Sequence, residues 1–260
     1  MRLLIAVRRI VLLLGLPAVL FTAWWFGSAH SSDFYFPPLS TILHSFREVW
    51  TPARLRSDVA PSLLRLASGY LLATAAGVGL GLLIGMSRLV REVLEPVLEL
   101  FRAIPPPVLV PVIMLFAGIG DTMKVLVIAF GCFWPILLNT VEGVRSVDEV
   151  LSDTCRCYCV DGSARLRHLV LRSASPRIAT GMRQSLAIGI IVMVISEMFA
   201  ASNGLGFTIV EFQRSFAIPE MWSGILLLGM LGFLLSFLFA LLEKRLLAWH
   251  FGLRRNQRIS

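Results

Sequence analysis

Six long runs of apolar residues dominate the sequence, and each is long enough to cross a membrane as a helix. A bilayer core about 30 Å thick requires about 20 residues in helical form. Backbone amides and carbonyls cannot bind water there, so they must bind one another. A helix is the structure in which a single run satisfies all of them. We therefore expect an all-α membrane protein with six transmembrane helices. The runs cover residues 10–28, 63–86, 97–117, 125–144, 182–201 and 222–247.

The composition agrees with this class, because 57% of the residues are hydrophobic and 15% are charged. In soluble domains about a quarter of the residues are charged. The first run could instead be a cleaved signal peptide, since Arg8 and Arg9 precede it and small residues follow at 27–29. However, it is long for such a segment, and it ends in the aromatic residues 24–26, which are typical of the membrane interface. We interpret it as a retained helix.

The distribution of Lys and Arg predicts the orientation. With the N-terminus in the cytoplasm, the inner segments hold most of these residues, which is the bias found in membrane proteins. Both termini and residues 151–181 are then cytoplasmic, and the net charge of +8 requires no nucleic-acid partner. We divide the chain into an N-terminal span with an outer interfacial helix (1–58), a transmembrane core (59–248) and a basic cytoplasmic tail (249–260). The outer helix is expected within 36–50, where apolar residues recur with helical spacing.

The third run contains three consecutive prolines, Pro105, Pro106 and Pro107. Proline lacks an amide hydrogen and forces the preceding residue toward extended geometry, so we expect a broken helix. Irregular backbone at membrane depth is tolerated where protein or a water-filled cavity covers it. The break, with Arg102 beside it, therefore suggests the wall of a transport path.

Ionisable side chains within the runs are further candidates, because they are costly in lipid and face the bundle interior or water. Glu197 could form an ion pair with Arg102 that locks helices together, or it could line a path or gate. Arg65 and Glu99 lie near run ends and are expected to reach the interface. Asn139 could donate a hydrogen bond into the transport path, or it could take part in helix packing. The predicted residues of the path or gate are Arg102, Pro105, Pro106, Asn139, Ser185 and Glu197.

Small residues recur at every fourth position in two of the runs. Such stripes let helix backbones approach closely in a membrane. We interpret both stripes as packing surfaces within the chain or with a partner chain. The first consists of Gly69, Ala73, Gly77, Gly81 and Gly85, and the second of Gly181, Ser185 and Gly189.

The polar segment 151–181 separates the fourth and fifth runs. We expect a helix from 148 to about 158, a turn at 160–162, a second helix from 163, and a return toward the membrane that starts at Pro176. Apolar residues between Val150 and Leu171 would form a surface suited to another protein's groove. Its cysteines are at 155, 157 and 159, and because 157 points away from the other two on a helix, we expect no metal site.

The sequence contains no phosphate-binding loop of the form GxxxxGK[ST], no HExxH motif and no nucleophile elbow. We therefore expect the chain not to be an enzyme and to draw its energy from a partner.

Segment 151–181 resembles the EAA loop of permease subunits of binding-protein-dependent ABC importers. When the EAA pattern is aligned with this segment without gaps, its glycine falls on Cys159 and its first proline is replaced by Arg172. If the glycine is shifted, it falls on Gly162. Residues 101–148 and 195–209 look like the corresponding runs of permeases for nitrate, taurine and alkanesulfonates. The resemblance implies that the residues coupling this chain to an ATPase are Asp153, Thr154, Cys155, Arg156, Cys159, Asp161, Gly162, Leu169, Leu171 and Pro176.

The resemblance also implies a type I ABC importer permease fold with a cytoplasmic coupling helix, in a bacterial inner membrane. The implied partners are a second permease chain, identical or homologous, two ATPase subunits that carry ATP and Mg, and an extracytoplasmic substrate-binding protein. The implied substrate is a small anion such as a sulfonate, nitrate or aromatic carboxylate, with a vitamin precursor as the alternative. The alternative function, a secondary transporter or channel, predicts inverted repeats and several membrane-embedded carboxylates or histidines.

Overall fold

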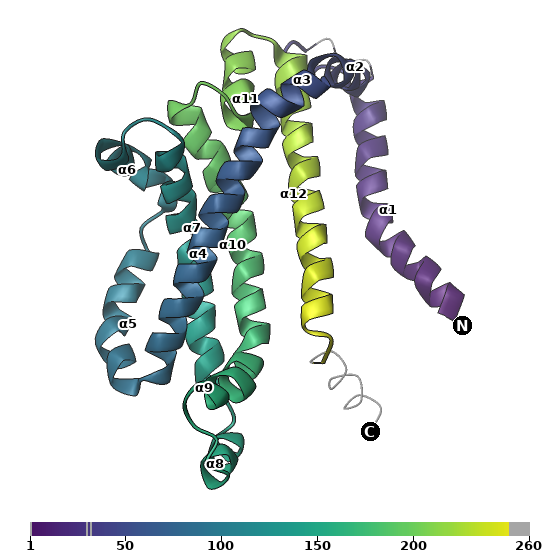
Figure 1. Cartoon of the computed structure of the whole chain (residues 1–260). Coiled ribbons are helices and arrows are strands. Elements are labelled where there is room, and N and C mark those ends of the chain that lie inside the picture. Colours follow the sequence, from purple (N-terminus) through teal and green to yellow (C-terminus); the bar gives the residue numbers. More distant parts are fainter. Residues whose placement is uncertain (1, 30, 32, 250–260) are drawn as a thin grey trace.

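The computed structural model describes residues 2–29, 31 and 33–249, and it describes side chains from residue 15 onward except that of residue 200. Within these residues every regular element is helical, which confirms the predicted class (Figure 1). The predicted tail 249–260 falls outside them but for its first residue. The elements are α1 (Arg2–Ser28), α2 (Leu39–Val49), α3 (Pro52–Arg54), η1 (Leu55–Val59), α4 (Ala60–Met86), α5 (Arg88–Arg102), η2 (Pro106–Leu109), α6 (Val110–Ala117), α7 (Asp121–Arg145), α8 (Glu149–Cys157), α9 (Gly162–Arg165), η3 (Leu166–Val170), α10 (Leu171–Ala200), α11 (Leu205–Arg214) and α12 (Ile218–Leu246).

Four continuous helical stretches among the described residues are long and apolar enough to span a membrane. They are Pro52–Met86, Asp121–Arg145, Gly162–Phe199 and Ile218–Leu246. A fifth span forms if α5 is joined to Pro106–Ala117, and the two parts are bent by 82°. The first predicted run lies within α1, part of whose side chains fall outside the description.

The predicted break in the third run is confirmed, because α5 ends at Arg102 and the next helical turn begins at Pro106. The predicted start of this run, residue 97, is wrong. The helix begins at Arg88, after Ser87 caps it by accepting a hydrogen bond from the Val90 amide at 3.4 Å. The charges of α5 lie along one face of the helix, so they do not interrupt it.

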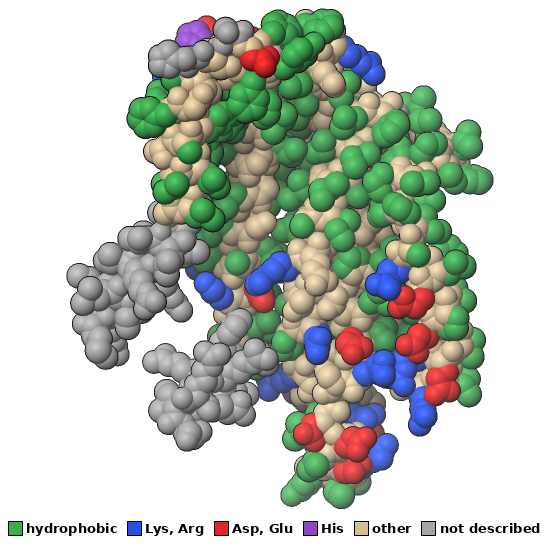
Figure 2. All heavy atoms as spheres, turned by 180° about the vertical axis from the view of Figure 1, so that it is seen from behind, with side chains coloured by type: hydrophobic (Ala, Val, Ile, Leu, Met, Phe, Trp, Pro, Cys, Tyr) green, Lys and Arg blue, Asp and Glu red, His purple; other side chains and the backbone are tan. Residues whose placement is uncertain are grey.

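The helices form an elongated bundle with two distinct ends. α2, α3 and α11 lie at one end, which we call the α2 end, and α8 and α9 lie at the other, which we call the α8 end (Figure 1). On the face drawn in Figure 2, charged side chains gather toward the α8 end, whereas hydrophobic side chains cover much of the rest. This division is what a membrane protein with one strongly charged side requires.

The centre of the bundle is made by α4, α7 and α10, which pack through the two stripes of small residues. A Cβ atom added to Gly77 would lie 2.9 Å from Ile136 Cγ2, and one added to Gly81 would lie 2.6 Å from Thr140 Cβ. On α10, an added Cβ at Gly181 would lie 2.6 Å from the Pro135 carbonyl oxygen. These spacings allow the helices to touch along their backbones, so the predicted packing role of both stripes is confirmed.

Aromatic side chains attach the peripheral helices at the α2 end. The Trp222 ring meets those of Trp24 and Phe36 with centroids 6.1 and 5.5 Å apart. The Trp50 indole N–H donates to Ser223 Oγ at 3.0 Å. The predicted interfacial helix is therefore α2, held between α1 and α12.

Candidate functional site

The segment from α8 to α9, residues 149–165, projects from the α8 end, and we call it the α8 knob (Figure 1). Its helix begins after Asp148, whose Oδ1 accepts hydrogen bonds from the amides of Val150 and Leu151 at 2.8 and 3.3 Å. The two helices are tied together where Arg165 Nη2 donates to Ser152 Oγ at 2.9 Å. The predicted helix, turn and second helix are confirmed.

The turn of the knob contains two residues in the left-handed region. Cys159 has φ 53° and Gly162 has φ 59°. Glycine adopts this conformation without the steric penalty that a Cβ brings. Cys159 stands at the glycine of the EAA pattern in the ungapped comparison, so the backbone there has the geometry that a glycine favours.

The prediction that Pro176 starts the return toward the membrane is wrong. The return starts at Gly162, and a continuous helical stretch runs from there to Phe199 with Pro176 inside it. A proline within a membrane helix is tolerated when neighbouring helices support it. Here Ala174, which is fully buried, packs against α7 next to Gly143.

The predicted coupling residues divide into an exposed and an inward-facing group. Of the apolar residues predicted to form the partner-binding surface, Val150 is 73% exposed, whereas Leu169 and Val170 are buried in the bundle. Leu169 and Val170 therefore do not belong to the knob's surface, contrary to the prediction. Leu171, Pro176 and Cys155 are partly buried, and the exposed predicted residues are Asp153, Thr154, Arg156, Cys159, Asp161 and Gly162.

The ion pair between Arg102 and Glu197 that the sequence left open is not formed. Arg102 is exposed at the end of α5, where its Nη2 and Nε lie 2.6 and 3.0 Å from Glu99 Oε2. Glu197 is fully buried and binds Arg65 of α4 instead, with Nη1 and Oε1 2.8 Å apart. Each of the two residues is thus paired with a different partner.

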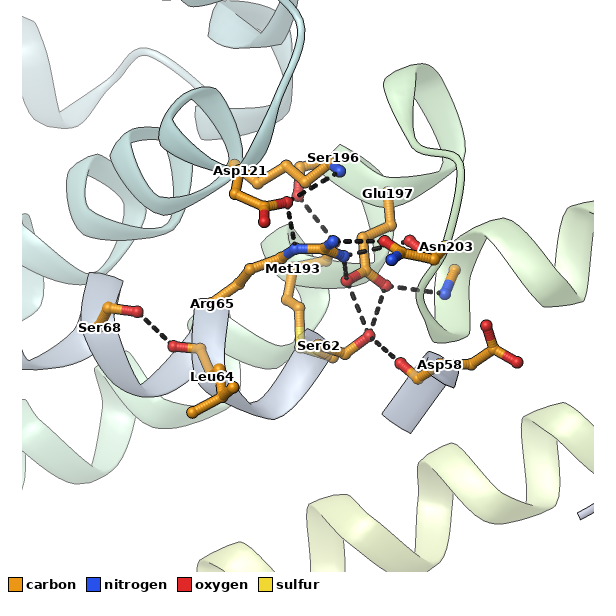
Figure 3. Close-up of polar contacts among 12 residues, drawn as sticks. Asp58, Ser62, Leu64, Arg65, Ser68, Asp121, Met193, Ser196, Glu197 and Asn203 are labelled. Carbon is orange, nitrogen blue, oxygen red and sulfur yellow. Dashed lines mark hydrogen bonds and ion pairs between the residues drawn. The ribbon is translucent and has the colours of Figure 1, made fainter. Parts of the chain in front are cut away.

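Arg65 is the centre of a buried polar network, shown in Figure 3, that we call the Arg65 cluster. Its Nε donates to Asp121 Oδ1 at 2.8 Å, and Nη1 also donates to the Asn203 carbonyl oxygen at 3.1 Å. Lys124 Nζ lies 3.5 Å from the same Asp121 oxygen. The network therefore joins α4, α7 and the α10–α11 loop. Its members are Ser62, Arg65, Asp121, Lys124, Glu197 and Asn203.

Glu197 receives further hydrogen bonds that satisfy its buried carboxylate. Ser62 Oγ lies 2.7 and 2.9 Å from its two oxygens, and the Gly206 amide donates to Oε2 at 3.0 Å. The loop closes over the carboxylate at Gly204, which has φ 122° and where a Cβ would lie 2.5 Å from Glu197 Cδ. These donors satisfy the buried carboxylate, which holds the Arg65 guanidinium in place.

Arg65 was expected to reach the membrane interface, and the structure shows that its side chain lies between helices, with 4% of the residue exposed. A signal for this was present in the sequence. Arg65 precedes Gly69 by four residues and therefore continues the small-residue stripe of α4, whereas Glu197 lies two such steps after Gly189 on α10, beyond Met193. Extending the first stripe by one step and the second by two would have placed both charges in the interface between helices.

Two pockets lie beside the polar groups. One of about 590 Å³ adjoins the Arg65 cluster. The other, of about 260 Å³, lies between α5 and α7 and includes Glu99 and Asn139. Asn139 Nδ2 donates to the Pro135 carbonyl at 2.8 Å and meets Gln184 Oε1 at 3.3 Å. Of the other predicted path residues, Pro105 is exposed, Pro106 packs near Gly131, and Ser185 is fully buried where α10 meets α7.

The charged face of α5 borders the second pocket, and the sequence reasoning missed it. At 100° per residue, six charged side chains of α5 fall within about 100° of arc. Such a face in a membrane span requires water or protein beside it. The residues are Arg88, Arg91, Glu92, Glu95, Glu99 and Arg102.

Known proteins share this architecture. A family described as the binding-protein-dependent transport system inner membrane component matches residues 77–248. The taurine transport system permease protein TauC of Escherichia coli (strain K12) is 31% identical over 250 residues, covering 94% of this chain and 91% of TauC. An aliphatic sulfonates transport permease protein, SsuC, of Bacillus subtilis (strain 168) is 30% identical over 236 residues, covering 90% of this chain and 86% of SsuC.

Among solved structures, an inward-facing form of the MetNI methionine ABC transporter superposes with a TM-score of 0.62 at 19% identity, covering 74% of this chain and 94% of that chain. This likeness confirms the predicted type I importer permease fold, and the sequence relatives confirm the predicted branch. The chain belongs to the family of inner membrane permease components of binding-protein-dependent ABC transport systems.

Proposed function

We propose that this chain is the permease subunit of an ATP-driven importer that carries a small anion into the cytoplasm. The observation that carries the proposal is the α8 knob, which projects from the bundle with Val150, Leu151 and Tyr158 exposed. Apolar side chains on a rigid helical projection are suited to a groove in a partner protein. Membership of a binding-protein-dependent transport family supports an ATPase as that partner.

The proposed assembly places the α8 end in the cytoplasm and the α2 end outside. Two ATPase subunits, each binding ATP and Mg, bind the knobs of two permease chains, identical or homologous. An extracytoplasmic substrate-binding protein delivers the solute at the α2 end. Both chain termini are cytoplasmic in this arrangement, as the Lys and Arg distribution predicts.

Two features support an anionic substrate. The relatives TauC and SsuC are named for taurine and aliphatic sulfonates. The chain also carries two cationic residues, Arg65 and Lys124, in the wall of the pocket at the α2 end. A sulfonate is therefore the first substrate to test, with nitrate and aromatic carboxylates next.

We place the path along the charged face of α5 and the broken span. Arg102 and Pro105 are exposed there, Pro106 lies next to them, and Asn139 lines the pocket between α5 and α7. Ser185 and Glu197, both fully buried, support the helices around the path.

Co-reconstitution tests the function. The permease is expressed with its ATPase and placed in liposomes with the binding protein and taurine inside. In permease molecules whose α2 end faces the liposome interior, taurine-loaded binding protein should raise ATP hydrolysis. Taurine should then leave the liposomes, because import into the cytoplasm corresponds to export from the liposome in this orientation. ATP-independent, gradient-driven taurine movement would contradict the proposal and favour a secondary transporter.

Replacing Asp153 with lysine should uncouple hydrolysis from transport. The Asp153 side chain is 68% exposed on α8 and lies 3.3 Å from Arg156, so the change reverses a surface charge without disturbing the core. We expect transport per ATP hydrolysed to fall by about tenfold, the scale of one lost charged contact. Glu48→Lys, the same charge change on an exposed side chain of α2, is the control. Equal coupling ratios in the two variants would remove the α8 knob from the mechanism.

The orientation predicts a labelling pattern. In a variant whose native cysteines are replaced, an impermeant maleimide should label a cysteine at Ser31 in intact cells. A cysteine at Ser163, which is exposed on α9, should react only after permeabilisation. Labelling of Ser163→Cys in intact cells would reverse the assigned topology.

A further inference from the structure

The charges of the Arg65 cluster are not balanced among its buried members. The side chains of Arg65 and Lys124 are 5% and 4% exposed, and that of Glu197 is 0% exposed. Two buried cations therefore face one buried acid. The second positive charge is balanced by Asp121, whose side chain is 69% exposed. An exposed carboxylate thus completes the ionic balance of a buried site.

Asp121 makes contacts that another anion could make in its place. Its Oδ1 lies 2.8 Å from Arg65 Nε and 3.5 Å from Lys124 Nζ. The second distance is longer than the roughly 2.8 Å of a charge-assisted hydrogen bond, so the Lys124 ammonium is held loosely. An ammonium has three donors, and a closer oxyanion would be bound more strongly.

The pocket of about 590 Å³ gives such an anion access to both cations. Its polar wall contains Arg65, Asp121, Lys124 and Asn203, with the guanidinium fixed by Glu197. Its remaining wall is largely apolar. A charged head group would meet the cations while a short apolar group lay against the apolar lining residues, which are Met114, Ile119, Phe199 and Ala201.

We propose that this pocket is a binding site for a small organic anion, in which Arg65 and Lys124 bind its sulfonate or carboxylate group. Asp121 occupies the position of that group when the pocket holds no anion, and the anion displaces it. The inference rests on the proposed function for its orientation, because it places the site at the outer mouth. Binding is an exchange of counterions, and no bond is formed or broken.

Protection of a cysteine at Ser202, an exposed residue of the pocket wall, tests the proposal. The variant lacks the native cysteines and is purified with its ATPase in lipid nanodiscs. Its labelling rate with an anionic methanethiosulfonate is measured against added methanesulfonate or dimethyl sulfone, which is similar in size but neutral. We expect methanesulfonate to slow labelling and dimethyl sulfone to leave it unchanged. Equal effects of the two compounds would overturn the proposal.

Asp121→Asn gives the sharpest result, because the two possible roles of Asp121 predict different outcomes. If Asp121 competes with the bound anion, its removal strengthens anion binding. If it is only a structural partner of Arg65, its removal does not. We expect the half-protecting methanesulfonate concentration to fall by about tenfold, since a hydrogen bond to a charged group is worth about that factor. Lys124→Met should raise it by a similar factor, and Lys124→Arg should restore protection. Glu211→Gln, an exposed change on α11, is the control. An unchanged or higher concentration in Asp121→Asn would identify Asp121 as a structural partner only.

The labelling assay in nanodiscs and the transport assay in liposomes together distinguish this proposal from the proposed function. Protection by methanesulfonate without any effect of the permease on ATP hydrolysis would contradict the proposed function and leave the site intact. ATP-driven taurine transport without protection would overturn the site and leave the proposed function intact.

Discussion

Replacing Glu197 with alanine should lower the free energy of unfolding by about 3 to 5 kcal/mol, because it leaves the Arg65 guanidinium buried without its acid. The two side chains are 0% and 5% exposed, so solvent screens the pair only weakly. Ser62 and the Gly206 amide also lose their acceptor. Unfolding by sodium dodecyl sulfate in mixed micelles measures the change.

Glu99→Ala is the matched control for this loss. Glu99 also pairs with an arginine, Arg102, but both side chains are more than half exposed, so the change should stay within about 1 kcal/mol. The double change Arg65→Met with Glu197→Met should recover part of the Glu197 loss, because Asp121 still balances Lys124. Equal destabilisation by Glu197→Ala and Glu99→Ala would show that the Arg65 cluster contributes no more than a surface pair.

Replacing Gly81 with leucine should cost about 3 kcal/mol of unfolding free energy, because its Cβ would lie 2.6 Å from Thr140 Cβ and 3.1 Å from the Leu137 carbonyl oxygen. Relief would require α4 to move away from α7 and open the contact along its length. The measurement is the same detergent unfolding titration.

Gly79→Leu provides the control two residues away in the same helix. An added Cβ there has no neighbour within 4 Å, and leucine favours the helix more than glycine does. We expect a change of no more than about 0.5 kcal/mol, or a small stabilisation. A comparable loss in both variants would mean that the stripe is not what holds α4 against α7.

The helices were predictable from the sequence because apolar runs and prolines act locally. A run of sufficient length must be helical in lipid, and three prolines remove successive backbone donors wherever they stand. The start of α5 was missed for a different reason. Its charges are interspersed with apolar residues, and they form one face only when the chain is wound as a helix.

The partners within the Arg65 cluster were not predictable, because they depend on how the helices are rotated about their axes. Arg65 and Glu197 are 132 residues apart. The sequence offered Arg102 as the partner of Glu197, since both lie within apolar runs. Depth in the membrane alone does not determine which side of a helix a residue occupies. The stripe of small residues indicates which side of α4 faces its neighbours, and Arg65 lies on the same side.

The glycine of the EAA pattern falls on Cys159 without a gap and on Gly162 with one. Shifting the glycine to Gly162 was attractive because it recovered the residue type. Both positions take the left-handed conformation, Cys159 with φ 53° and Gly162 with φ 59°. Cys159 thus has a backbone geometry that glycine favours, and its residue type alone could not reveal this.

The small-residue stripe of α4 also has a consequence for alignment along the helix axis. A surface that repeats every four residues looks similar after a slide of about 6 Å, the rise of four residues. Glycine at 69, 77, 81 and 85 and alanine at 73 would fit bulky neighbours on α7 almost as well one step up or down. Arg65 ends this repeat, and it meets Asp121 and Glu197 together. Such a contact selects one position of α4 along the axis of α7 from several near-equivalent ones. The charged residue therefore fixes the register of an otherwise periodic interface.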